Sequence, residues 1–68
     1  MRLTVNGQPL DGQSSWKLNE LLFEISGQSD PEGTAVAVNE EVIPRGQWAQ
    51  TSLNEGDRIE ILGAVSGG

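Results

Sequence analysis

The sequence contains no cysteine, no histidine and no tyrosine among its 68 residues. Without cysteine the chain cannot form a disulfide, supply a thiolate nucleophile or offer sulfur to a metal. Without histidine it also lacks the most common general base and the imidazole metal ligand. These absences exclude most mechanisms by which so short a chain could act as an enzyme by itself, and no bound cofactor is expected.

Basic residues are scarce, because four lysines and arginines stand against ten acidic residues, a formal net charge of −6. This charge repels phosphate backbones and anionic lipid surfaces, so we expect neither nucleic acid nor membrane as a partner. No apolar run approaches the ~20 residues of a membrane span. The sequence opens on alternating residues without the apolar segment of a secretory signal. We therefore expect a cytoplasmic protein that is monomeric when alone.

The first residues predict a β-hairpin. Met1 to Val5 alternate between apolar and polar residues, which is typical of a half-buried strand. Asn6-Gly7 follows at once and favours a type I′ turn, so a second strand should return through Gln8 to Leu10. Because Pro9 cannot donate a ladder hydrogen bond, this second strand should lie at an edge of the sheet.

A helix is predicted between Ser14 and Ile25, with Ser14 or Ser15 as the N-cap and Gly27 as the C-cap. Its apolar stripe, spaced at i, i+3, i+4 and i+7, consists of Leu18, Leu21, Leu22 and Ile25. This stripe should pack on the sheet.

The second half predicts a second hairpin and a last strand. The strands are expected at Ala35–Val38, Glu41–Ile43 and Arg58–Leu62, with a turn at Asn39-Glu40. Between them, Trp48 and Leu53 should anchor an irregular segment or a single helical turn against the core. Within the last strand, Ile59 and Ile61 should face inward.

The order strand, strand, helix, strand, strand, strand predicts an α+β fold: a mixed sheet of about five strands crossed by one helix on one face. If the last strand lies beside the first, this is a small β-grasp. The predicted organisation is one domain over residues 1–62 and a flexible C-terminal tail over residues 63–68 that ends in Gly-Gly.

Few residues offer chemistry of their own. The acidic clusters lie in predicted turns or on the outer helix face, where carboxylates are usually solvated, and none has calcium-loop spacing. Phosphate-loop, acyl-enzyme and zinc-protease motifs are missing from the sequence. Trp16 and Trp48 are interpreted as core residues, because a core of this size needs large side chains. No metal site is expected.

The C-terminus is the remaining candidate site. A run ending in Gly67-Gly68 is a frayed tail in many proteins. It can also carry a function, because two residues without Cβ can pass through a narrow channel and present the terminal carboxylate to a partner enzyme. Once that carboxylate is joined to AMP, a sulfur or nitrogen nucleophile can displace AMP. A chain without thiol or imidazole can thus be the substrate that carries a group.

Three segments resemble the ThiS family of sulfur carriers: Val38-Asn39-Glu40-Glu41-Val42-Ile43-Pro44-Arg45 followed by Trp48, then Leu53-Asn54-Glu55-Gly56-Asp57-Arg58-Ile59-Glu60-Ile61, and finally Val65-Ser66-Gly67-Gly68. The resemblance extends over the whole chain and is strongest in its second half. A terminal Gly-Gly alone is shared with ubiquitin and with the small subunit of molybdopterin synthase. Lys17 departs from the pattern, because the family often places a small helix-capping hydroxyl there.

The resemblance implies a ubiquitin-like β-grasp whose Gly68 is adenylated with ATP by a ThiF-type enzyme and converted to a thiocarboxylate. A sulfur donor system would supply sulfur that originates from cysteine. A ThiG-type thiazole synthase would take up the sulfur for thiamine biosynthesis. Ser66 and Gly67 would thread into the partner. Leu62 and Val65 are candidate contact residues, since Leu62 should face away from Ile59 and Ile61.

Three alternatives remain open from the sequence. The chain could be a ubiquitin-like modifier joined to a lysine of another protein, although its single lysine, Lys17, disfavours extended chains. It could also deliver sulfur to another acceptor such as molybdopterin. A noncovalent adaptor would not need Gly67 and Gly68 at all.

Overall fold

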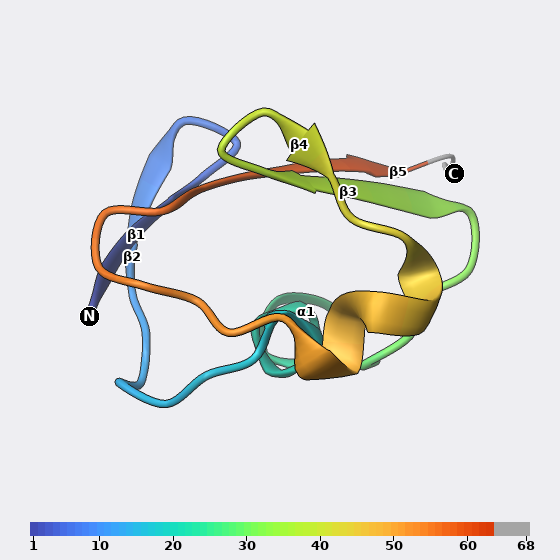
Figure 1. Ribbon diagram of the computed structural model, residues 1–68, viewed down its shortest axis with the longest axis horizontal. Coiled ribbons are helices and arrows are strands. Elements are labelled where there is room, and N and C mark those ends of the chain that lie inside the picture. The colour runs from blue at the N-terminus through green and yellow to red at the C-terminus, as the bar shows by residue number, and fades with distance from the viewer. Residues whose placement is uncertain (64–68) are drawn as a thin grey trace.

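A five-stranded mixed sheet forms the upper layer of the molecule in Figure 1, a computed structural model that describes residues 1–63. Its elements in chain order are β1 (Arg2–Val5), β2 (Gln8–Asp11), α1 (Leu18–Ser26), β3 (Thr34–Val38), β4 (Glu41–Val42), the 3₁₀ helix η1 (Arg45–Gln50) and β5 (Arg58–Gly63). The strand order is β2-β1-β5-β3-β4. Among these strands of residues 1–63, only β1 and β5 pair in parallel. The predicted β-grasp is confirmed, with the last strand between the first and the third.

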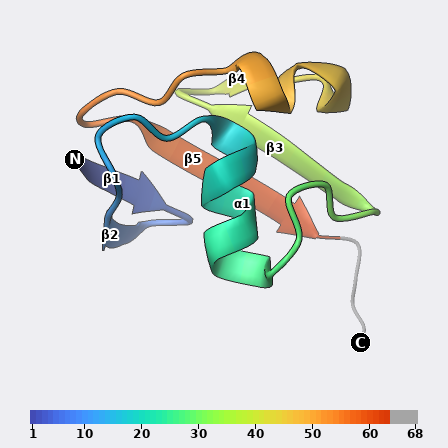
Figure 2. The same ribbon diagram turned by 90° about the horizontal axis from the view of Figure 1, so that it is seen from below.

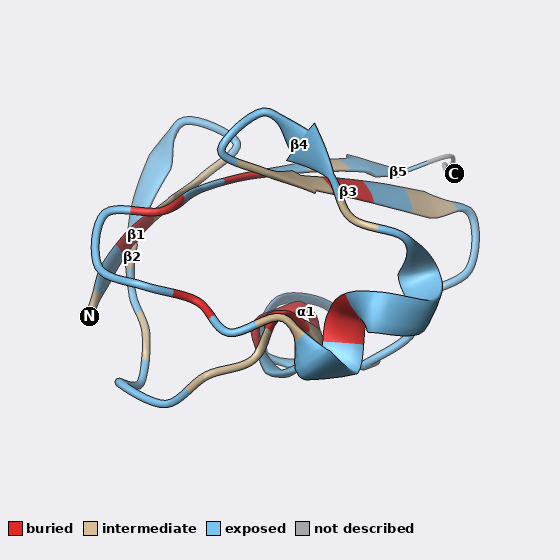
Figure 3. Ribbon diagram, viewed as in Figure 1, coloured by how far each residue is buried: buried red, intermediate tan, exposed pale blue. Residues whose placement is uncertain are grey.

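Helices α1 and η1 cover one face of the sheet, and within residues 1–63 no helix covers the other face, which we call the open face (Figures 1 and 2). The core lies between these layers, where Figure 3 shows the buried residues of the sheet facing those of the helices. Its buried apolar side chains are Leu3, Leu18, Leu21, Leu22, Val36, Trp48, Leu53 and Ile59. Within residues 1–63, the helices are too short to cross a membrane.

Both predicted hairpins are confirmed, and both turn on residues with positive φ. Asn6 and Gly7 have φ of 50° and 82°, and Asn39 and Glu40 have φ of 52° and 72°. These are the left-handed values that a type I′ turn requires at its two central positions. Pro9 lies on β2, an edge strand as expected.

The predicted helix start was wrong. The helix begins at Leu18, and neither Ser14 nor Ser15 caps it. Lys17 stays extended because the segment around it pairs with the chain near Ser52: the Leu18 N–H donates to the Thr51 carbonyl at 2.8 Å, and the Leu53 N–H donates to the Trp16 carbonyl at 3.1 Å. The Glu20 carboxylate accepts the Lys17 N–H at 2.7 Å, as the third residue of a helix does in a capping box. Because lysine has no side-chain acceptor, the Glu20 N–H donates to the Lys17 carbonyl at 3.0 Å where a hydroxyl cap would otherwise accept it.

At the end of the helix, the predicted C-cap is confirmed, but the predicted burial of the last apolar residue is wrong. Gly27 adopts φ of 81° and donates its N–H to the Phe23 carbonyl at 2.7 Å, so the predicted C-cap is confirmed. Ile25, expected in the core, is 47% exposed. It lies in the last turn, and the exposed loop that follows leaves this turn uncovered.

Asp57, in the turn before β5, is the charged residue whose side chain is buried within the described chain. One carboxylate oxygen accepts the Asn39 Nδ2 hydrogen at 2.9 Å, and the other accepts the Asn54 N–H at 2.8 Å. The carboxylate therefore ties the β3–β4 turn to the turn that precedes β5.

We expect Asp57→Ala to lower the free energy of unfolding by about 1 to 3 kcal/mol, because it removes the two hydrogen bonds that this buried carboxylate accepts. Urea unfolding followed by circular dichroism measures the loss. Glu55→Ala, which removes an exposed carboxylate from the same turn, is the control and should cost less. Equal effects of the two substitutions would contradict this role for Asp57.

Candidate functional site

The C-terminal end of β5 lies where the sheet narrows to two strands. The register of β1 reaches only Val5 opposite Ile59, whereas β3 continues to Thr34 opposite Gly63. On the other side, β4 stops at Val42 opposite Ala37. We call Thr34, Ala35, Leu62 and Gly63 the exit end of the sheet. It contains the last residue that the structure describes, at the C-terminal end of β5 in Figure 2.

Leu62 points to the open face of the sheet, as the sequence predicted from its position relative to Ile59 and Ile61. It is 69% exposed, whereas Ile59 is 1% exposed. Because directly paired residues of antiparallel strands share a face, the register places four apolar side chains together: Ala35, Ala37, Val42 and Leu62. We call these four the open-face patch; it borders the exit end and includes two of its residues.

Charged residues border the open-face patch. Glu60 is the partner of Ala37 across the ladder and is exposed. Arg58 lies two residues before it and pairs with Glu40 at 3.4 Å. Both side chains of this ion pair are largely exposed, so it adds little to stability. The arrangement is an apolar centre with a charged rim, which is typical of a surface that meets another protein.

The other residues expected at the site, Val65, Ser66, Gly67 and Gly68, lie outside the described residues. Their threading, contact and modification stay predictions. Leu62 lies within the described chain, but its contact with a partner likewise stays a prediction.

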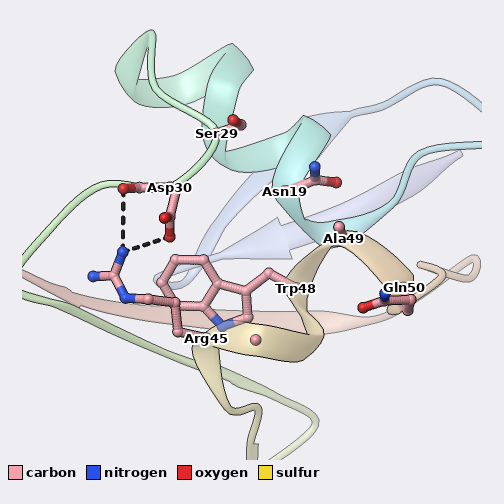
Figure 4. A pocket seen from close by; sticks show the side chains of 8 residues that line it. Asn19, Ser29, Asp30, Arg45, Trp48, Ala49 and Gln50 are labelled. Atoms are coloured by element: carbon pink, nitrogen blue, oxygen red, sulfur yellow. Dashed lines mark hydrogen bonds and ion pairs between the residues drawn. The ribbon is translucent and has the colours of Figure 1, made fainter.

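A shallow groove of about 380 Å³ lies on the other side of the molecule, between α1, the loop before β3 and η1. Figure 4 shows Arg45 from η1 facing Asp30 across this groove, with the Trp48 indole beside it. The Arg45 guanidinium lies 5.0 Å from the Trp48 ring centre, bonds the Asp30 carboxylate and donates to the Pro31 carbonyl at 2.7 Å. The charges lining the groove thus satisfy one another, and the contacts pin the loop to η1.

Trp48 is structural, as expected. It is 2% exposed, and its Nε1 hydrogen is donated to the Ile43 carbonyl at 2.9 Å. Trp16 packs against the edge of the core. Neither indole is therefore presented as a stacking platform for a ligand.

Charge on the described surface is mostly negative and mostly unpaired. Arg2, Arg45 and Arg58 each pair with a carboxylate, and Lys17 donates to the Ser52 hydroxyl at 2.9 Å. The hydrogen bond from Arg2, together with its positive charge, lowers the pKa of Asp11 below the usual value of a carboxyl group. Within the described part of the chain no three acidic side chains converge as metal ligands would.

Sequence reasoning missed one feature at the exit end. The Asn6 side chain, interpreted only as a turn residue, reaches the main chain of Ile61 on β5. The Asn-Gly pair signals a turn, but nothing in the sequence indicates that this amide contacts a strand 55 residues away.

Comparison with known proteins finds a match over nearly the whole chain. The model of the ThiS family matches residues 3–68. The sulfur carrier protein ThiS of Escherichia coli strain K12 is 31% identical over 68 residues, which cover both chains completely. A crystal structure of a thiamine biosynthesis protein (ThiS) from Geobacter metallireducens superimposes with a TM-score of 0.76 at 36% identity, again over the full length of both chains.

A second kind of relative is longer. A thiazole synthase of Paramagnetospirillum magneticum is 34% identical over 68 residues, which are all of this chain but 20% of that protein. The chain therefore spans about a fifth of that relative, and the remainder of the relative has no counterpart in it.

Proposed function

The chain belongs to the ThiS family, and from that premise we propose that it is a sulfur carrier for thiamine biosynthesis whose reactive group is the carboxylate of Gly68. The observation that carries the proposal is the family match, which extends through residue 68 and so includes the Gly-Gly motif. The composition supports it, because a chain without cysteine or histidine has few other groups with which to hold sulfur. The chain is then a co-substrate and not an enzyme.

The proposed chemistry has two steps at one carboxyl group. A carboxylate oxygen of Gly68 attacks the α-phosphorus of ATP, and pyrophosphate leaves, which gives an acyl-adenylate. A sulfur nucleophile such as bisulfide then attacks the acyl carbon, and AMP leaves with the oxygen, which gives the thiocarboxylate. The adenylating enzyme supplies the ATP site. No ionisable group with a strongly shifted pKa is needed from the carrier.

Thiazole synthase is the proposed acceptor partner. The support is that a thiazole synthase contains a segment similar to the whole of this chain, which places carrier and synthase in one protein there. A ThiF-type adenylating enzyme and a cysteine-derived sulfur donor are proposed from the chemistry, since a carboxylate must be activated before sulfur can replace its oxygen.

Intact-mass measurement tests the function. Incubation of the protein with an adenylating enzyme, ATP and bisulfide should exchange one oxygen for one sulfur, and fragmentation should place the sulfur on Gly68. A mass that stays that of the free carboxylate would refute the carrier function. A covalent adduct to a lysine of another protein would instead favour the modifier alternative.

Leu62 gives a second prediction, because the open-face patch borders the chain that leads to Gly68. We expect Leu62→Glu to raise the KM of the adenylating enzyme for the carrier about tenfold, since it places a charge in an apolar contact, and to leave kcat unchanged. Stability should change by no more than about 0.5 kcal/mol, because the side chain is exposed.

The matched control is Phe23→Glu. Phe23 is 58% exposed on α1, which covers the opposite face of the sheet. Steady-state adenylation kinetics of both variants decide the point. If Phe23→Glu raises KM as much as Leu62→Glu does, docking through the open-face patch is wrong.

A further inference from the structure

Two asparagines hold β5, one at each end. Each is the first central residue of a type I′ turn. At the start of β5, Asn39 Oδ1 accepts the Arg58 N–H at 2.9 Å. Near its end, Asn6 Oδ1 accepts the Ile61 N–H at 2.7 Å, and Asn6 Nδ2 donates to the Ile61 carbonyl at 3.2 Å.

The ladder pattern shows why Ile61 needs this side chain. The Asn39 N–H donates to the Arg58 carbonyl at 2.7 Å, so the main-chain groups of residues 58, 60 and 62 face β3, and those of 59, 61 and 63 face β1. The last main-chain bond from the β1 side is that of the Asn6 N–H to the Ile59 carbonyl, at 2.9 Å. The Asn6 side-chain amide then stands where the next peptide group of β1 would be.

We call the two bonds between the Asn6 amide and Ile61 the clamp. The clamp lies two residues before Gly63, at the point where the sheet narrows to β3 and β5. With it, β5 is bonded on both sides as far as Ile61. Without it, residues 60–63 are held to the sheet only by β3. A strand end bonded on one side opens locally at a lower free-energy cost than one bonded on both.

We propose that Asn6 is a positioning residue for the C-terminal segment: its amide keeps the end of β5 ordered, so that the activating enzyme meets a fixed exit direction. The inference rests on the proposed function, because it concerns how Gly68 reaches that enzyme. A segment ordered in advance loses less conformational freedom on binding. Asn6 acts through Ile61 and does not touch the reacting carboxylate.

The test compares Asn6→Gly with Asn39→Gly. Glycine accepts the positive φ of both turns, so each variant keeps its turn and loses the side-chain bonds to one end of β5. Asn6→Gly should speed hydrogen exchange of the Ile61 N–H and raise KM for adenylation about tenfold, the factor for ordering about one more residue on binding. The kcat should not change.

Asn39→Gly should lower stability at least as much, because it also removes the bond to Asp57, and should leave KM unchanged. A third variant, Asn6→Asp, keeps the acceptor for the Ile61 N–H but puts a carboxylate against the Ile61 carbonyl. It should therefore raise KM as Asn6→Gly does.

Two results would overturn the inference. The first is that Asn6→Gly changes neither the hydrogen exchange of the Ile61 N–H nor the KM for adenylation. The second is that Asn39→Gly raises this KM in proportion to the stability that it loses. Failure of the proposed function is a separate result, since it appears as no sulfur on the wild-type protein. In that case hydrogen exchange of the Ile61 N–H still tests whether the clamp orders the end of β5. Unchanged exchange in Asn6→Gly would show that it does not, and faster exchange in Asn6→Gly but not in Asn39→Gly would show that it does.

Discussion

A chain shortened by one residue, so that it ends at Gly67, will not acquire sulfur. The shortened chain still ends in a glycine carboxylate, so the chemistry of the group is unchanged. Its position is what changes, because one extended residue spans about 3.3 to 3.6 Å, and a displacement of ~1 Å from the reactive geometry can cost a hundredfold in rate. We expect at least this loss in adenylation, measured by ATP–pyrophosphate exchange and by intact mass.

Gly68→Val complements the deletion, because it keeps the length of the chain and adds a branched side chain beside the carboxylate. It should also abolish sulfur transfer, since the channel proposed for the tail admits residues without Cβ. Ser66→Ala is the control, which keeps both length and terminal glycines and should react. If the shortened chain acquires sulfur at the wild-type rate, the length of the tail does not determine where the carboxylate lies in the adenylating enzyme.

Trp48→Ala should remove a large share of the stability of the protein. Truncating a buried tryptophan costs about 3 to 5 kcal/mol, and the Ile43 carbonyl also loses its donor. The whole stability expected for a chain of this length, at about 0.05 to 0.15 kcal/mol per residue, is ~3 to 10 kcal/mol. Urea unfolding followed by circular dichroism measures the loss, and Trp16 remains as a fluorescent reporter.

Trp48→Phe separates the volume of this side chain from its hydrogen bond. The phenyl ring keeps most of the apolar contact but cannot donate to Ile43, so a smaller loss of about 1 to 3 kcal/mol is expected. Gln47→Ala, at an exposed position of the same 3₁₀ helix, should be nearly neutral. A loss below about 1 kcal/mol for Trp48→Ala would mean that η1 does not anchor the core.

Local rules predicted most of the fold because most elements follow their own sequence. The turns at Asn6-Gly7 and Asn39-Glu40, the cap at Gly27 and the inward Ile59 depend on residues within a few positions of one another. Tertiary contacts decided where prediction failed. The helix start moved to Leu18 because residues 16–18 pair with residues 51–53, and no local pattern records a partner so far along the chain.

In the candidate site, too, local sequence predicted some features, and others depended on tertiary contacts. The outward direction of Leu62 follows from strand alternation and was predicted. The open-face patch required the register of three strands, which hydrophobic pattern alone does not determine. The contact of Asn6 with Ile61 required knowing that β5 lies beside β1. Functional assignment of Gly68 came from family resemblance, because two glycines by themselves indicate only freedom of the backbone.

The central place of β5 has a consequence for synthesis. β5 is the last strand of the described residues to be made, yet it pairs with both β1 and β3, so the sheet stays in two separate halves until β5 has left the ribosome. Pairing between residues this distant in sequence is also the slow part of folding. A ribosome that stops before β5 therefore releases neither a closed sheet nor an exit end. An assembled sheet is therefore a sign that translation has passed through its middle strand.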